Sequence, residues 1–146
     1  MRFMILRKAD KNTEAGVMPS EKLLAAMGQY MADSAKAGIL LAGEGLQASA
    51  KGARVKFAGG KPTVSDGPFA EPQQLVAGFC MIQAKSKQDA IDWVKRWPAL
   101  DGDGNVEIEI RQLFEAEDFG AEFTPEMRQA ELCSRVETAA NAAKTK

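Results

Sequence analysis

The chain has 146 residues, of which 45% are hydrophobic and 27% charged, a balance typical of a folded domain that excludes global disorder. Its 19 basic and 20 acidic side chains give a net charge of −1, so nothing global favours nucleic-acid binding. No apolar run approaches the roughly 20 residues of a membrane span. We therefore expect neither a nucleic-acid partner nor a membrane partner.

The two cysteines and the absence of histidine limit the kinds of disulfide, metal and acid–base chemistry that we expect. Two cysteines, Cys80 and Cys133, make no disulfide framework and suit a reducing compartment. The amino-terminal residues 1–7 lack the long apolar segment of a signal peptide, so we expect a cytoplasmic protein. The sequence has no histidine, the commonest general base and metal ligand. We expect no metal site and no cofactor, and any acid–base chemistry falls to carboxylates.

The first forty residues predict a strand, a loop and a helix. The apolar run 3–6 predicts a strand buried on both faces, and the polar stretch 9–19 predicts a loop. Ser20 is a good N-cap for a helix that ends at Gly38, because its hydroxyl can accept from an amide of the first turn. A second strand, 39–43, follows this helix.

The middle of the chain predicts a hairpin and a central strand. Residues 53–57 alternate between polar and apolar, and Gly59-Gly60 is a good tight turn because both residues can adopt a positive φ. The return strand is predicted at 61–65. Residues 75–83 are apolar at nearly every position, as expected of a strand in the middle of a sheet.

The element order predicts an α+β fold. A helix capped by Ser86 and stopped by Pro98 precedes an alternating strand at 106–110. Two strand–helix–strand units around a hairpin are typical of a ferredoxin-like, split-βαβ domain with its helices on one sheet face. The strands combine apolar and charged positions, which fits two sheets facing each other across a two-fold axis and enclosing polar pockets. We predict a homodimer.

The carboxyl-terminal part reads as a separate module. We place an α+β domain at 1–115 and a helical extension at 116–146, with the helix beginning at Thr124-Pro125. Its apolar stripe is weak, so the helix would be marginal alone. We expect it to pack against the domain or against a partner subunit.

The segment from Asp66 to Glu71 is the most distinctive in the chain. Asp66-Gly67 favours a turn, Pro68 restricts φ, and Phe69 can anchor the loop in the core. Such a loop would hold the carboxylates of Asp66 and Glu71 at defined positions, as a catalytic or ligand-contacting pair. Alternatively, Asp66 accepts hydrogen bonds from turn amides and Glu71 is solvated, which from composition alone is the commoner case.

Three further residues complete the candidate site. Glu44 lies between two glycines, which allow a ligand or a neighbouring strand to approach closely; a solvated carboxylate at a strand end is an equal alternative. Arg54 and Arg111 are candidates for neutralising an anionic substrate group, although a solvated strand face is the commoner role for such residues. The candidate catalytic residues are thus Asp66, Glu71 and Glu44, and the candidate substrate-binding residues are Arg54, Phe69 and Arg111.

The run from Thr63 to Glu71, followed by Gly78-Phe79, resembles the DGPF branch of the YCII-related proteins. The resemblance spans about the first 115 residues and continues weakly beyond them. It implies a dimeric α+β barrel in bacterial, cytoplasmic proteins, often encoded beside extracytoplasmic-function sigma factors. The biochemical role of this branch is largely unassigned.

Two departures limit what the resemblance implies. Some YCII-like relatives carry a His–Asp pair, and one of these is a dehydrochlorinase, but a chain without histidine cannot form that pair. In addition, Pro72-Gln73-Gln74 replaces a segment that usually carries charge. We expect a homodimer that binds a small polar metabolite, with lyase- or isomerase-type proton transfer by carboxylates. The alternative is a non-catalytic sensor or regulatory partner in a sigma-factor system.

Overall fold

The computed structural model describes residues 1–144, which form two compact units. The first unit is Met1–Leu113, and the second begins at Phe114. The strands of the first unit are β1 (Arg2–Lys8), β2 (Leu40–Gly45), β3 (Ala53–Ala58), β4 (Lys61–Asp66), β5 (Val76–Gln83) and β6 (Ile108–Gln112). Its α-helices are α1 (Lys11–Glu14), α2 (Glu21–Lys36) and α3 (Lys87–Val94).

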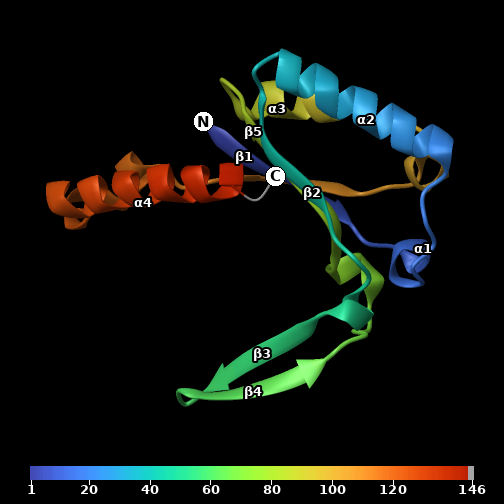
Figure 1. Cartoon of the computed structure of the whole chain (residues 1–146), viewed down its shortest axis with the longest axis horizontal. Coiled ribbons are helices and arrows are strands. Elements are labelled where there is room, and N and C mark those ends of the chain that lie inside the picture. Colours follow the sequence, from blue (N-terminus) through green and yellow to red (C-terminus); the bar gives the residue numbers. More distant parts are fainter. Residues whose placement is uncertain (145–146) are drawn as a thin grey trace. The chain divides into compact units, whose positions relative to one another are not determined.

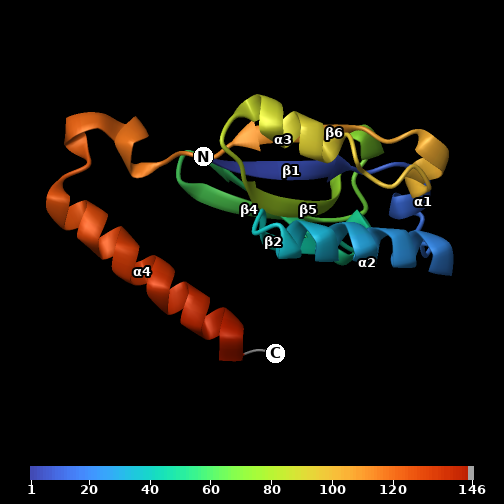
Figure 2. The ribbon, with the colours of Figure 1, turned by 90° about the horizontal axis from the view of Figure 1, so that it is seen from above.

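Four of these strands form an antiparallel sheet in the order β2-β5-β1-β6, and β3 pairs with β4 in a separate two-stranded hairpin. The helices α2 and α3 cover one face of the four-stranded sheet (Figure 1 and Figure 2), while the hairpin projects on the side away from them (Figure 1). The fold is therefore mixed α+β with antiparallel sheets, as expected. Helix and strand positions agree with the sequence pattern to within a few residues.

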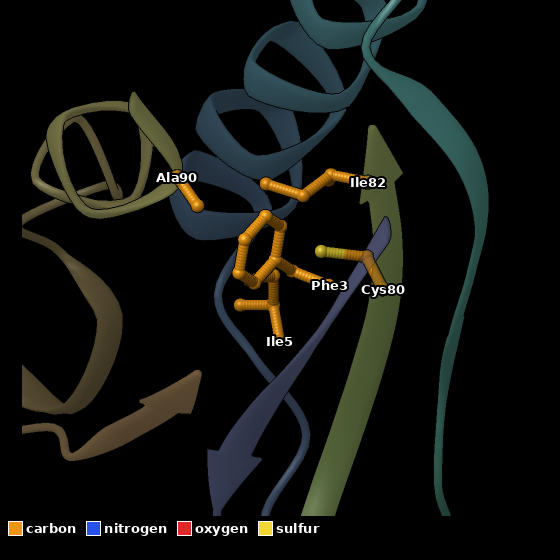
Figure 3. Packing of buried hydrophobic residues seen from close by; sticks show 5 residues of the cluster. All are labelled: Phe3, Ile5, Cys80, Ile82 and Ala90. Atoms are coloured by element: carbon orange, nitrogen blue, oxygen red, sulfur yellow. The ribbon is translucent and has the colours of Figure 1, made fainter. Parts of the chain in front are cut away.

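The hydrophobic core lies between the helices and the sheet. It contains Phe3 and Ile5 of β1, Cys80 and Ile82 of β5, and Ala90 of α3 (Figure 3). The first strand, expected to be buried on both faces, is within one copy buried on its helix side and half-buried on the other side. Burial alternates along β1, because helices cover only the face that carries Phe3 and Ile5.

Capping side chains set the helix starts. The Ser20 hydroxyl accepts from the amide of Leu23 at 3.2 Å, and the Ser86 hydroxyl accepts from the amide of Asp89 at 3.1 Å. The loop predicted at 9–19 was wrong in part, because α1 lies within it. Asp10 caps this short helix in a reciprocal arrangement with Thr13 that the residue types Asp and Thr at this spacing allow.

A buried ion pair joins β1 to the connection between α3 and β6. The Arg7 guanidinium donates from Nη2 to Asp101 Oδ1 at 2.6 Å and from Nε to Asp101 Oδ2 at 3.1 Å. Both side chains are 9% exposed. Trp97 Nε1 donates to Asp101 Oδ2 at 2.9 Å, and Arg7 Nη1 donates to Asp10 at 2.8 Å. The connection between α3 and β6 is thus tied to the first strand.

The second unit contains a 3₁₀ segment, Ala116–Glu122, and the helix α4 (Pro125–Lys144). The predicted helix start is confirmed, and Thr124 Oγ1 accepts from the amide of Met127 at 3.3 Å. Three phenylalanines precede the helix. The ring centroids of Phe114 and Phe119 are 5.2 Å apart, and those of Phe119 and Phe123 are 5.4 Å apart. Within residues 1–144, no helix is both long and apolar enough to cross a membrane.

Candidate functional site

The sheet face that the helices leave uncovered, here called the open face, carries two rows of side chains. The strand register aligns Glu44, Phe79, Leu6 and Glu109 in one row, and Ala42, Met81, Met4 and Arg111 in the next. Side chains alternate along each strand, and the neighbours of these residues point toward the helices. The open face therefore has an apolar middle with a carboxylate at both ends of one row.

Gly43 shows why Glu44 points to the open face. A Cβ atom at Gly43 would lie 2.5 Å from Met31 Cε of α2 and 3.1 Å from Cys80 Cβ. The helix thus packs directly on this glycine, so the next residue projects to the other side of the sheet. The close approach that the glycines were expected to allow is made on the helix side by Met31.

Charged groups on β1 and β6 form a small surface network at one edge of the open face. Arg111 Nη1 donates to Glu109 Oε1 at 3.0 Å, and Lys8 Nζ lies 3.7 Å from Glu109 Oε2. The hydrogen bond from Arg111, with the charge of Lys8, lowers the pKa of Glu109. Arg111 is therefore paired with a carboxylate of its own strand.

The DGPF loop, residues 66–71, starts at the last residue of β4 and is held by backbone contacts. The Gly67 amide donates to the carbonyl of Gly52 at 2.9 Å. A Cβ atom at Gly67 would lie 1.8 Å from the carbonyl oxygen of Ser49, so only glycine fits. The Gly67–Pro68 peptide bond is cis. The loop thus packs closely on the turn Ser49–Lys51.

Ser49 and Glu14 hold the loop from the other side. The Ser49 hydroxyl accepts from the amide of Phe69 at 2.9 Å and donates to the carboxylate of Glu14. The Ser49 amide also donates to this carboxylate, at 3.1 and 3.2 Å to its two oxygens. A chain of hydrogen bonds therefore runs from α1 through Ser49 to the DGPF loop.

Two of the candidate substrate-binding residues, Arg54 and Phe69, contact each other. The Arg54 guanidinium carbon lies 4.0 Å from the centroid of the Phe69 ring, in a cation–π contact. Arg54 belongs to β3 and Phe69 to the DGPF loop, so this contact joins the hairpin to the loop. The aromatic ring is half-buried and does not belong to the hydrophobic core, so the expected anchoring of the loop in the core was wrong.

The two carboxylates of the loop differ in their surroundings. The Glu71 side chain accepts a hydrogen bond from Gln74 Nε2, and the residue adopts a left-handed backbone conformation with φ of 62°. The Asp66 side chain is exposed and accepts no hydrogen bond from any of residues 1–144. The turn amides expected in the alternative interpretation therefore do not occupy Asp66.

The six predicted site residues fall into two groups. Glu44 and Arg111 lie on the open face, and they are separated by the full width of the four-stranded sheet. The remaining four belong to the hairpin and the loop that follows it: Arg54, Asp66, Phe69 and Glu71. Only the contact between Arg54 and Phe69 joins two of the six directly among the interactions of the described residues.

Sequence reasoning missed Glu14 and Ser49, which hold the DGPF loop. They are 35 positions apart, and neither belongs to a motif of its own. The available signals were Gly52 and Gly67, because a glycine at a crowded turn indicates close approach by another backbone. No pattern in the sequence could have matched Glu14 to that turn.

A separate hollow of about 380 Å³ lies on the helix side of the first unit. It is lined by α2 and the end of α3, including Tyr30, Trp93 and Arg96. The Arg96 guanidinium lies 4.6 Å from the Trp93 ring, and the Trp93 indole donates to Ser34 Oγ at 3.0 Å. None of the six predicted residues lines this hollow.

The described residues show little sign of thiol or metal chemistry. Burial raises the pKa of Cys80 to about 11, which keeps the thiol protonated near neutral pH. Cys133 is exposed on α4. Between residues 1 and 144, no group of three or more cysteine or acidic side chains is arranged to hold a metal ion.

Comparison with known proteins gives a distant structural neighbour and a family. No curated protein matches the chain. One solved structure that matches is 5-chloro-2-hydroxyhydroquinone dehydrochlorinase (TftG) from Burkholderia phenoliruptrix AC1100, in complex with 2,5-dihydroxybenzoquinone. The sequences are 13% identical, the TM-score is 0.40, and the match covers 80% of this chain and 98% of the other. At that TM-score the similarity supports no assignment of activity.

The family model for the YCII-related domain matches residues 1–115. This range includes the whole four-stranded sheet, both helices that cover it, the hairpin and the DGPF loop. The match extends over most of the chain, and the chain belongs to the YCII-related domain family.

Proposed function

We propose that the protein is a homodimeric, small-molecule-binding member of the DGPF branch, in which carboxylates transfer a proton on a small polar metabolite. The reaction is of the lyase or isomerase type. Its candidate groups are Asp66 and Glu71 on the DGPF loop and Glu44 on the open face. We propose that the protein acts in the cytoplasm, as the family resemblance of its sequence implies.

One observation carries this proposal: the DGPF loop is fixed while its Asp66 carboxylate is left available. Gly67 and Phe69 are held by backbone and hydroxyl groups, and Phe69 also stacks on Arg54. Asp66 is exposed and accepts no hydrogen bond from residues 1–144. A fixed backbone beside an unengaged carboxylate is the preorganisation that a general base or a ligand contact requires.

The dimer supports this site by closing the open face. The strand order β2-β5-β1-β6 is the order of a ferredoxin-like, split-βαβ sheet, which we propose pairs with a second copy as a dimeric barrel. The apolar middle of the open face, formed by Met4, Leu6, Phe79 and Met81, is only half-buried in one copy. Covering it removes apolar surface from water and favours association.

The proposed proton transfer uses the carboxylates of the candidate site. One carboxylate removes a proton from carbon or oxygen of the substrate, and the resulting carboxylic acid returns it at a second position. Arg54 is a candidate to neutralise an anionic group of the substrate at the DGPF loop, because its guanidinium lies 4.0 Å from the Phe69 ring of that loop. Arg111 is a weaker candidate because it is already paired with Glu109.

A binding experiment tests the proposal. The full chain is purified from its host and inspected by native mass spectrometry and crystallography for a small molecule beside Asp66 and Glu71. In parallel, thermal shifts are measured with a panel of small hydroxy and oxo acids. We expect Asp66→Asn and Glu71→Gln to lose at least tenfold in ligand affinity or turnover, about 1.4 kcal/mol.

The matched control is Glu21→Gln, an exposed carboxylate on α2 at the covered side of the sheet. This variant should bind and turn over as the unchanged protein does. If both Asp66→Asn and Glu71→Gln also leave binding and turnover unchanged, the DGPF loop is architecture and the proposed site is wrong.

The second candidate function is a regulatory partner in an extracytoplasmic-function sigma-factor system. It is favoured by α4, which exposes Leu132 and Val136 one turn apart. Such a pair is typical of a helix that docks on another protein. The variants Leu132→Glu and Val136→Glu in the full chain should abolish capture of the sigma factor while ligand thermal shifts stay unchanged. Retained capture would remove this candidate.

A further inference from the structure

The β3–β4 hairpin has an apolar face that nothing in its own unit covers. All residues from Ala53 to Asp66 are exposed. Val55 and Val64 are directly paired across the strands, and Phe57 is paired with Pro62 on the same face. The exposed fractions of Val55, Phe57 and Val64 are 55%, 68% and 66%. An isolated two-stranded hairpin is only marginally stable in water. We therefore expect another surface to bind this exposed apolar face.

The hairpin is also strongly basic. Between positions 51 and 66 there are four basic residues, Lys51, Arg54, Lys56 and Lys61, and one acidic residue, Asp66 at the end of β4. This stretch carries +3, so the rest of the chain, at −1 overall, carries −4. Two hairpins placed against each other would repel. The charge favours an acidic occupant from elsewhere on a second copy.

Residues 114–126, here called the aromatic–acidic segment, match the hairpin in both respects. The segment contains no basic residue, and its acidic residues are Glu115, Glu117, Asp118, Glu122 and Glu126. Its phenylalanine rings stack with centroids 5.2 and 5.4 Å apart. Phe114 is 69% exposed and Phe119 is 49% exposed. The segment offers aromatic surface and five carboxylates, of which Glu117 Oε1 lies 3.8 Å from Nη1 of Arg128 on α4.

We infer that the aromatic–acidic segment of one copy docks on the apolar face of the β3–β4 hairpin of a second copy. The phenylalanines cover Val55, Phe57 and Val64. The hairpin is only two strands wide, roughly 5 Å between strands, so lysine side chains reach around its edges to the carboxylates. This inference rests on the homodimer of the proposed function and adds a specific contact to it.

The topology of the first unit favours a second copy as the source of the segment. The chain leaves β6 at Gln112, which is paired with Phe3, whereas the hairpin leaves the sheet where Gly45 is paired with Gly78. These are opposite ends of the sheet. When two open faces meet about a two-fold axis that runs across the strands, each end lies over the opposite end of the partner sheet. The exit of one copy then lies near the hairpin of the other.

Engineered disulfides in the full chain test the contact directly. Val64→Cys lies on the apolar hairpin face and Ala121→Cys lies in the aromatic–acidic segment, both combined with Cys133→Ser to remove the exposed native thiol. Chains of two different masses, each with one of these cysteines, are mixed and oxidised. We expect a disulfide that joins the two chains. The matched control pairs Ala121→Cys with Thr63→Cys, which lies on the opposite hairpin face and should couple much less.

Charge reversal gives an independent readout. Lys56→Glu with Lys61→Glu should raise the dimer dissociation constant about tenfold, and Glu117→Lys with Glu122→Lys should do the same. Combining the four changes in one chain should restore much of the affinity. Lys22→Glu with Lys36→Glu on α2 is the control and should leave the dissociation constant unchanged. The measurement is analytical ultracentrifugation across a range of salt concentrations.

The outcomes separate this inference from the homodimer itself. A chain carrying both Val64→Cys and Ala121→Cys that forms only an internal disulfide shows contact within one copy and overturns the inference. Failure to couple in a chain that sediments as a dimer also overturns it, while the homodimer stands. If the unchanged chain sediments as a monomer at all concentrations, both the dimer and this contact are wrong, and the ligand test at Asp66 remains separate.

Discussion

The four-stranded sheet and the β3–β4 hairpin are built from similar alternating strands, but their burial is opposite. In the sheet, every second residue of β1 lies under α2 and α3, and the buried core includes Phe3, Ile5 and Ile82. In the hairpin, the residues with the same alternation are exposed throughout. The difference shows that alternation specifies a strand and its faces, whereas the helices decide which face becomes a core.

The two regions also differ in how polar groups are used. In the region of the four-stranded sheet, a buried, bidentate ion pair joins Arg7 to Asp101, and Trp97 donates a further hydrogen bond to Asp101. The hairpin joins the unit through its loop, by Ser49, Glu14 and the stacking of Arg54 on Phe69. We therefore expect substitutions in the first region to affect folding and those in the second to affect binding and association.

The largest expected effect is the loss of the buried ion pair. Asp101→Ala leaves the Arg7 guanidinium buried with only Asp10 as a charged partner, and should destabilise the protein by about 3–5 kcal/mol. Urea unfolding followed by circular dichroism measures this. The matched change Asp92→Ala removes an exposed partner of Lys95 and should cost less than about 1 kcal/mol. Equal losses would contradict the assignment of Arg7–Asp101 to the folding core.

Truncating one apolar side chain in each region sharpens the comparison. Ile82→Ala removes a fully buried side chain and should cost about 2–5 kcal/mol. Val64→Ala should stay within about 0.5 kcal/mol in protein dilute enough to keep copies apart, because its side chain is exposed in one copy. A large loss for Val64→Ala under these conditions would mean that the hairpin is covered within its own copy.

The junction between the two regions should respond with an intermediate loss. Gly67→Ala places a Cβ atom 1.8 Å from the Ser49 carbonyl oxygen, so the loop must move. We expect a destabilisation of about 1–3 kcal/mol and loss of ligand binding at Asp66. Gly45→Ala is the control, since nothing lies within 4 Å of the added atom. A Gly67→Ala protein with unchanged melting temperature and ligand affinity would show that the loop position is not required.

The smallest effect concerns the pH dependence of the core region. Desolvation would raise the pKa of Asp10, but hydrogen bonds from the Thr13 amide and from Arg7 outweigh it and lower the pKa below its ordinary value of 3.8. The resulting stability is present above about pH 4 and is lost as the pH falls through the lowered pKa. Asp10→Asn keeps a good N-cap but removes the charge that pairs with Arg7 Nη1 at 2.8 Å, so it should cost about 1 kcal/mol at pH 7 and less near pH 2. A loss that does not shrink in acid would contradict this linkage.

Much of the fold could be predicted from the sequence because its signals are local. Ser20 and Ser86 correctly predicted the starts of two helices, and Gly59-Gly60 correctly predicted the turn between β3 and β4. The last strand was predicted two residues early, at 106–110. Glu107 lies outside β6 because it makes only one hydrogen bond to β1: its carbonyl accepts from the amide of Lys8 at 3.0 Å. The regular pairing of β6 with β1 begins at the next residue, Ile108.

The candidate site could be predicted only in part. The DGPF motif identified Asp66, Phe69 and Glu71, and the structure places them on a fixed loop. The partners that hold this loop could not be found, because the contact of Glu14 with Ser49 depends on how α1 packs on a distant turn. Likewise, a strand pattern could not reveal that Glu44 and Arg111 lie at opposite edges of one face.

The central position of β1 also bears on how the chain folds during synthesis. β1 ends at Lys8, and its two sheet neighbours, β5 and β6, begin at Val76 and Ile108. At about 5–20 residues per second, the ribosome takes roughly 3–14 s to complete the interval before the first neighbour starts. During that time Phe3 and Ile5 have no strand to pair with. Among the four strands of this sheet, β1 is thus made first, and its pairing is completed only when β6, the last of the four, has been made.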